Sequence, residues 1–183
     1  MRTKNILSIA ALIICGLVCV NSVKAQTSDV TVNIKFKPIQ SIVVNTAQET
    51  VDLLYSSTTD YANGVSAEML DHLEVFSTGG FIVTANTDGD FTRTAGGSID
   101  ADDVTVKADF GTDTSIGSFT NVPLSTTPTT LISATEGGTT LKYNVTYDNT
   151  GAGAGNNYIN NYIHPDSPES VYTATVTYTI ATN

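Results

Sequence analysis

Apolar and polar residues alternate with a period of two in the last part of the chain, over residues 171–180. One set of alternate positions is apolar, and from residue 173 onward the other set is threonine. Because successive side chains of a β-strand point to opposite faces, this pattern predicts a strand with one face on a core. The residues expected on the core face are Tyr172, Ala174, Val176, Tyr178 and Ile180.

Shorter alternating runs predict further strands, with turns rich in Gly, Pro, Asn and Asp between them. They occur at residues 30–36, 41–45, 50–55, 73–77, 81–85, 129–134 and 141–147, and within residues 99–108, where an acidic turn at residues 100–103 is expected to break the pattern. Residues 73–85 are expected to form a β-hairpin around Gly79 and Gly80. Its core-facing residues are predicted to be Leu73, Val75, Phe81 and Val83.

Residues 66–73 have the spacing of a short helix instead, which Ser66 can cap and which places Met69, Leu70 and Leu73 on one side. Residues 56–65 before it are expected to be a polar connection. About nine short strands with frequent turn signals are typical of two packed antiparallel sheets. We therefore expect an all-β fold, a single immunoglobulin-like or pilin-like antiparallel β-sandwich with at most one short helix.

The first 25 residues have the three parts of a secretory signal peptide. A cationic start is followed by an apolar stretch over residues 6–20, and Val23 and Ala25 suit the positions before a cleavage site. The apolar stretch is shorter than the roughly 20 residues of a membrane-spanning helix. We expect residues 1–25 to be removed on export and residues 26–183 to form one extracellular or cell-surface domain that does not insert into a membrane.

Charge and cysteine content narrow the classes of function. Both cysteines, Cys15 and Cys19, lie in the predicted signal peptide, so the mature chain would enter an oxidising compartment without a disulfide. Removal of the signal leaves five basic and 18 acidic residues, a formal charge of −13. Such an acidic chain is not expected to bind nucleic acid.

The residues available for catalysis form no recognisable motif, and we expect the protein not to be an enzyme. The mature chain has two histidines, His72 and His164, and neither lies in a metalloprotease or hydrolase motif. His72 is expected to be a partly exposed structural residue. The carboxylates gather in predicted turns, where Asp is common because it bonds to its own backbone.

Two loops offer candidate ligand sites. Asn86, Asp88 and Asp90 place oxygen atoms at every second residue, as at the start of a calcium loop, although the glutamate that completes such a loop is missing. A structural calcium ion is therefore a candidate cofactor, and turn formation is the alternative role. Tyr158 and Tyr162 lie in an Asn-rich loop and could stack on sugars, cover a sheet edge or make assembly contacts. They support a second possible function, a soluble secreted carbohydrate- or ligand-binding module.

The final run, which reads YTATVTYT from Tyr172 to Thr179, resembles the closing strand of pilin-type domains. Such domains include chaperone–usher fimbrial subunits, spore coat U-like proteins and WxL-like surface proteins. The resemblance implies an exported cell-surface structural or adhesive subunit, a fimbrial protein assembled by β-strand addition. The partners it implies are further copies or other pilin-like subunits, with a periplasmic chaperone and usher during transit.

In the mechanism that this resemblance implies, a neighbouring subunit completes the sandwich with an N-terminal strand of alternating apolar residues. Val30, Val32, Ile34 and Phe36 would be those residues here. In the interpretation that we slightly favour from the sequence, residues 30–36 are simply the first strand of their own domain. If they are donated instead, residues 41–45 become the first strand.

Overall fold

The computed structural model describes residues 25–163 and 168–183, so the predicted signal peptide, apart from Ala25, lies outside the described residues. The compact unit is Lys37–Asn183. Residues 25–36 belong to a separate unit, and they form no helix or strand.

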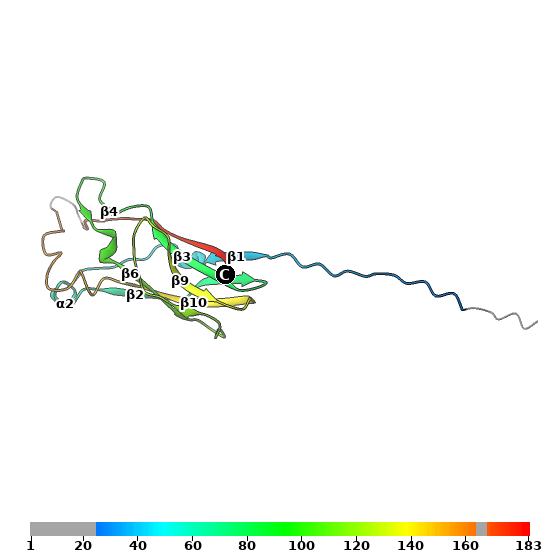
Figure 1. The fold of residues 1–183 in the computed structure, drawn as a ribbon. Helices are drawn as coiled ribbons and strands as arrows, with labels where there is room; N and C mark the ends of the chain where they lie inside the picture. Colours follow the sequence, from blue (N-terminus) through cyan, green and yellow to red (C-terminus); the bar gives the residue numbers. More distant parts are fainter. Residues whose placement is uncertain (1–24, 164–167) are drawn as a thin grey trace, which may run out of the picture. The chain divides into compact units, whose positions relative to one another are not determined.

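The compact unit is built almost entirely from β-strands in two antiparallel sheets (Figure 1). The five-stranded sheet has the order β1 (Gln40–Val44), β2 (Ser66–Ser77), β10 (Gly138–Asp148), β6 (Thr105–Phe110) and β8 (Val122–Pro123). The four-stranded sheet has the order β11 (Val176–Thr182), β3 (Phe81–Thr87), β9 (Thr129–Ala134) and β7 (Ser118–Phe119). A small ribbon joins β4 (Phe91–Thr92) to β5 (Ser98–Ile99). The helical elements of the described residues are η1 (Thr46–Gln48), α2 (Thr58–Asn63) and η2 (Ala101–Asp103).

This architecture confirms the predicted all-β, sandwich-like fold, with 11 strands in the described residues where about nine were expected. The core is formed by alternate residues of the two sheets. Buried and partly exposed residues alternate along the whole of β3 and most of β10. The four residues predicted to point inward from residues 73–85 are all 0% exposed.

The connection between β2 and β3 passes from one sheet to the other, so the predicted hairpin is wrong. β2 pairs with β1 and β10, whereas β3 pairs with β11 and β9. The connection between β9 and β10 also crosses between the sheets and packs against the first crossing. A Cβ atom on Gly137 would lie 2.1 Å from the carbonyl oxygen of Ser77, so a residue with a side chain cannot replace this glycine without a backbone shift.

Residues 66–73 are not a helix but the first part of β2. Between Met69 and Leu73, β2 advances by four residues while β10 advances by two, from Val145 to Tyr143. The bulge lies between them, and Met69 and Leu73 both still pack on the core, because an even spacing puts two residues on the same face of a strand. Their spacing of four therefore imitates one helical turn, which explains the wrong prediction.

Three smaller differences from the sequence-based predictions concern a missing strand, an added helix and the start of β11. Residues 50–55 form no strand. The predicted polar connection contains α2, which begins with reciprocal capping bonds between Ser57 and Asp60. β11 begins at Val176, later than the alternating pattern suggests, so that Tyr172 and Ala174 precede the strand.

The two lateral sides of the sandwich are built differently. On one side, β7 and β8 end the two sheets, and residues 120–121 join these strands directly. On the other side, β1 and β11 end the sheets and lie beside each other without pairing (Figure 1). We call the side of β7 and β8 the closed side, and the side of β1 and β11 the open side.

Candidate functional site

β11 is an edge strand that is paired along one side only. Its partner is β3, with Val176 opposite Thr87 and Thr182 opposite Phe81. Within the described residues, no strand pairs with its other edge. Neither β11 nor β1 contains a charged residue or a proline, the residues that commonly block addition of a further strand. The open side therefore presents strand edges without this usual protection.

The core is incompletely covered at the open side. Val176, Tyr178 and Ile180 of β11 pack against it but stay partly exposed, as do Ile42 and Val44 of β1. The threonines that alternate with the apolar residues of the final run are exposed. Apolar side chains at these two edges thus have surface left to bury.

A chain of hydrogen bonds crosses the core beneath β11. The hydroxyl of Tyr178 lies 2.7 Å from that of Tyr147, which lies 3.0 Å from Nε2 of His72. Nδ1 of His72 lies 3.0 Å from Oε1 of Gln48. We call these four residues the core relay. The relay connects β11, β10, β2 and η1, and His72 is 2% exposed where partial exposure was predicted.

Burial determines the charge of the core relay. It lowers the pKa of His72 and raises the pKa values of Tyr147 and Tyr178. All three side chains are therefore neutral at neutral pH. The ring of His72 also packs edge-on at centroid distances of 5.8 Å from Tyr147 and 6.0 Å from Tyr178.

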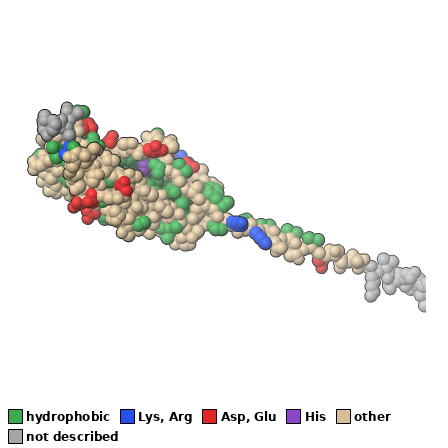
Figure 2. All heavy atoms as spheres, turned by 90° about the horizontal axis from the view of Figure 1, so that it is seen from above, with side chains coloured by type: hydrophobic (Ala, Val, Ile, Leu, Met, Phe, Trp, Pro, Cys, Tyr) green, Lys and Arg blue, Asp and Glu red, His purple; other side chains and the backbone are tan. Residues whose placement is uncertain are grey.

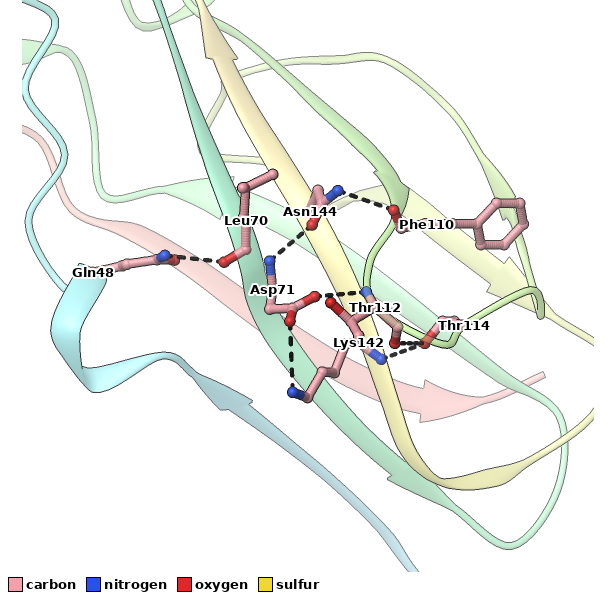
Figure 3. A network of polar contacts seen from close by, with 8 residues as sticks. All are labelled: Gln48, Leu70, Asp71, Phe110, Thr112, Thr114, Lys142 and Asn144. Carbon is pink, nitrogen blue, oxygen red and sulfur yellow. Dashed lines mark hydrogen bonds and ion pairs between the residues drawn. The ribbon is translucent and has the colours of Figure 1, made fainter.

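Polar contacts satisfy the β2 bulge at the outer face of the five-stranded sheet (Figure 3). The carboxylate of Asp71 accepts a hydrogen bond from the backbone N–H of Thr112 at 2.7 Å and lies 3.5 Å from Nζ of Lys142. The Thr112 N–H is the main cause that lowers the pKa of Asp71. Asn144 accepts from the N–H of Asp71 at 2.8 Å and donates to the carbonyl of Phe110 at 3.0 Å. These contacts hold the irregular backbone in place.

An open depression of about 370 Å³ adjoins this network. Its lining is Val43, Val44, Asn45, Thr46, Asp71, Glu74 and Lys142. Asp71 and Lys142 are already paired with each other.

The two candidate ligand tyrosines differ in their surroundings. The hydroxyl of Tyr158 donates to Oδ2 of Asp103 at 2.6 Å and accepts from the amide of Asn149 at 3.1 Å. The hydroxyl of Tyr55 donates a hydrogen bond to Oδ1 of the same Asn149. The ring centroid of Tyr55 lies 5.5 Å from that of Tyr158. Burial raises the pKa of Tyr158. Tyr162 is 47% exposed, so it is the one of the two with substantial ring surface for a ligand.

The candidate calcium ligands make separate structural contacts. Oδ1 of Asp88 accepts the backbone N–H of Thr175 at 2.8 Å, which fastens the residue before β11. Oδ1 of Asp90 accepts the N–H of Ala101 at 3.1 Å. Asn86 lies in β3, opposite Thr177 of β11. Among residues 25–163 and 168–183, no three His, Cys, Asp or Glu side chains are grouped to hold a metal ion.

The N-terminal segment, residues 26–36, carries a row of exposed apolar side chains. Val30, Val32, Ile34 and Phe36 are 84%, 81%, 79% and 92% exposed. Figure 2 shows the hydrophobic side chains along this segment. The first strand of the compact unit is β1, so the interpretation of residues 30–36 as that first strand is wrong.

Sequence reasoning missed the core relay, because its four residues are scattered between Gln48 and Tyr178. A histidine and tyrosines at core-facing positions of alternating strands were the available signal.

No helix in the described part of the chain is long and apolar enough to cross a membrane. No protein-family model matches the sequence, and no curated protein is significantly similar to it.

Proposed function

We propose that this chain is an exported structural or adhesive subunit of the cell surface, a pilin-like protein that joins to further copies by β-strand addition. The N-terminal segment of one copy pairs with the open side of the next. The observation that carries this proposal is the row of four apolar side chains, each at least 79% exposed, at alternate positions of a segment that belongs to no strand.

The unprotected edges of β1 and β11 support the proposal from the acceptor's side. An added strand forms main-chain hydrogen bonds with an edge, and its alternate side chains enter the apolar layer beneath. Val, Ile and Phe side chains each gain about 1.5–3 kcal/mol on full burial. The partly exposed Val176 and Ile180 of β11, with Ile42 of β1, provide apolar surface for that burial.

The distribution of charge favours a second copy as the partner. Residues 26–37 contain Lys35 and Lys37 against one acidic residue, Asp29. Residues 38–183 contain 17 acidic residues against three basic ones. A weakly basic donor segment is therefore attracted to the acidic domain of another copy, which raises the rate of their encounter.

The proposal is tested by the mature protein purified in its native state. We expect a ladder of multimers in an unheated detergent gel and collapse to a monomer on boiling. Ile34→Asp should abolish the ladder, because it places a carboxylate on the apolar row. Asn33→Asp makes the same charge change on the alternate face and should keep the ladder. A wild-type monomer at every concentration, or an Ile34→Asp ladder, contradicts the proposal.

The second candidate function is that of a soluble ligand-binding module, and the exposed ring of Tyr162 favours it. Ile159 and Ile163 close to it in sequence are also exposed, at 57% and 37%. A monomer that binds a glycan, and that loses this binding on Tyr162→Ala, would support this function over strand addition.

A further inference from the structure

The hydrogen bonds of the core relay have a defined direction. Nε2 of Gln48 donates to the carbonyl of Leu70 at 3.0 Å, so Oε1 is the atom that faces His72. A carbonyl oxygen accepts hydrogen bonds, so Nδ1 of His72 carries the proton. In the neutral ring Nε2 is then an acceptor, which Tyr147 satisfies with its hydroxyl proton. The Tyr147 oxygen in turn accepts a hydrogen bond from the hydroxyl of Tyr178.

A second proton on His72 reverses this direction. Nε2 becomes a donor, so the oxygen of Tyr147 must accept from it and the Tyr147 proton must turn toward Tyr178. The hydroxyl of Tyr178 then has to find another acceptor in a site where its present partner is Tyr147. A buried donor without a partner is destabilising, and so is the new charge on His72.

We propose that the core relay is an acid-sensitive anchor of β11: protonation of His72 reverses the Tyr147–Tyr178 hydrogen bond, leaves the Tyr178 hydroxyl proton without an acceptor and so loosens the edge strand of the open side. Tyr178 is the side chain of β11 that makes this bond across to the five-stranded sheet. The neighbouring apolar residues Val176 and Ile180 contribute packing alone. The unsatisfied hydroxyl proton of Tyr178 therefore acts on β11 before it acts on the inner strands.

The groups that face the His72 ring agree with this assignment. They are Gln48 of η1, Tyr147 of β10 and Tyr178 of β11, all of which are uncharged at neutral pH. The carboxylate of the adjacent Asp71 is held by Thr112 and Lys142 at the outer face. Among the described residues, burial and not a charged neighbour is what shifts the pKa of His72.

The sign of the pH effect follows from the lowered pKa of His72. The unfolded or locally opened chain takes up a proton near pH 6.5, the ordinary value for histidine, whereas the closed state does not until lower pH. Stability is thus fully present above about pH 6.5 and is lost as pH falls toward the folded-state pKa. The limit for one group is about tenfold in the opening equilibrium per pH unit. An effect on assembly at the β11 edge rests additionally on the proposed function.

Amide hydrogen exchange of the β11 residues tests this inference. We would measure it between about pH 7.5 and pH 5 on the full mature chain carrying Ile34→Asp, corrected for intrinsic exchange rates. The Ile34→Asp substitution blocks the proposed strand addition, so the exchange of β11 is measured in the monomer. The result is the same whether or not the wild-type chain adds strands. The core-relay proposal can therefore fail without the strand-addition proposal, and the reverse also holds. We expect the protection of β11 to fall as the pH drops below 6.5, by at most about tenfold per pH unit.

His72→Gln should remove the pH dependence, and the matched change at the other histidine, His164→Gln, should leave it in place. If His72→Gln does not fold, nitrogen chemical shifts of His72 in the folded wild-type ring decide the question. We expect the Nδ1-protonated tautomer at pH 7.5 and protonation below pH 6.5 together with line changes at Tyr178. An Nε2-protonated tautomer, an ordinary titration, or equal β11 protection at both pH values would overturn the inference.

Discussion

The closed and open sides bound the same core in opposite ways. On the closed side the chain passes directly from β7 to β8, both strands are two residues long, and β8 ends in Pro123. On the open side β1 and β11 have five and seven residues, and no covalent link joins the two strands directly. Short strands and proline discourage strand addition, whereas long uncharged edges permit it. The domain thus protects one side against further strands and leaves the other available.

The largest expected effect distinguishes the two sides by their burial. Leu124, 1% exposed on the closed side, should lose about 2–5 kcal/mol of unfolding free energy on substitution to Ala, because the change leaves a cavity. Ile42→Ala on the open side should cost about 1 kcal/mol, because Ile42 is already partly exposed. Urea denaturation measures both values. Equal losses would show that the two sides are equally packed.

An intermediate effect concerns the two faces of β11. Val176→Asp should lower the unfolding free energy by about 2 kcal/mol, because a charge enters the apolar layer. Thr177→Asp, one residue away on the exposed face, should change it by less than about 0.5 kcal/mol. Thermal or urea unfolding of the two variants provides the comparison. Similar losses would contradict the assignment of the two faces.

The smallest effect on stability is expected for a charge on the β1 edge. Val43 is 56% exposed, so Val43→Lys should change the unfolding free energy by less than about 0.5 kcal/mol while it lowers the fraction of multimers. Leu70, which is 61% exposed on β2 inside the sheet, provides the matched variant Leu70→Lys. Multimers are counted by size-exclusion chromatography. An equal decrease in both variants would show that the β1 edge is not the acceptor.

Alternation along single strands could be predicted from the sequence because it depends on local geometry. Leu141, Tyr143, Val145 and Tyr147 alternate in the sequence, and all are less than 9% exposed in β10. The same rule was not enough between Met69 and Leu73, where the bulge interrupts the alternation: His72 and Leu73 are consecutive, and both are buried. A bulge depends on the partner strand, and β10 lies about 70 residues further along the chain.

The candidate site was predictable to a similar extent. The apolar row of residues 30–36 was visible in the sequence, yet its exposure was not, because alternation does not say whether a strand finds a partner. Sheet assignment was also beyond the sequence: β2 and β3 alternate as a hairpin would, although they lie in different sheets. The core relay depends on all these pairings at once, so it could be recognised only in the assembled fold.

The pairing of β11 with β3 has a kinetic consequence. Many of the other main pairings also join distant parts of the chain, as β2 does with β10. All-β domains dominated by such contacts fold in roughly milliseconds to seconds, more slowly than helical domains. Residues 176–182 lie about 90 residues after β3, so one edge of β3 stays unpaired until they have been synthesised and have docked. The nascent chain therefore passes through a period in which it is open to misassembly and has most need of a binding partner.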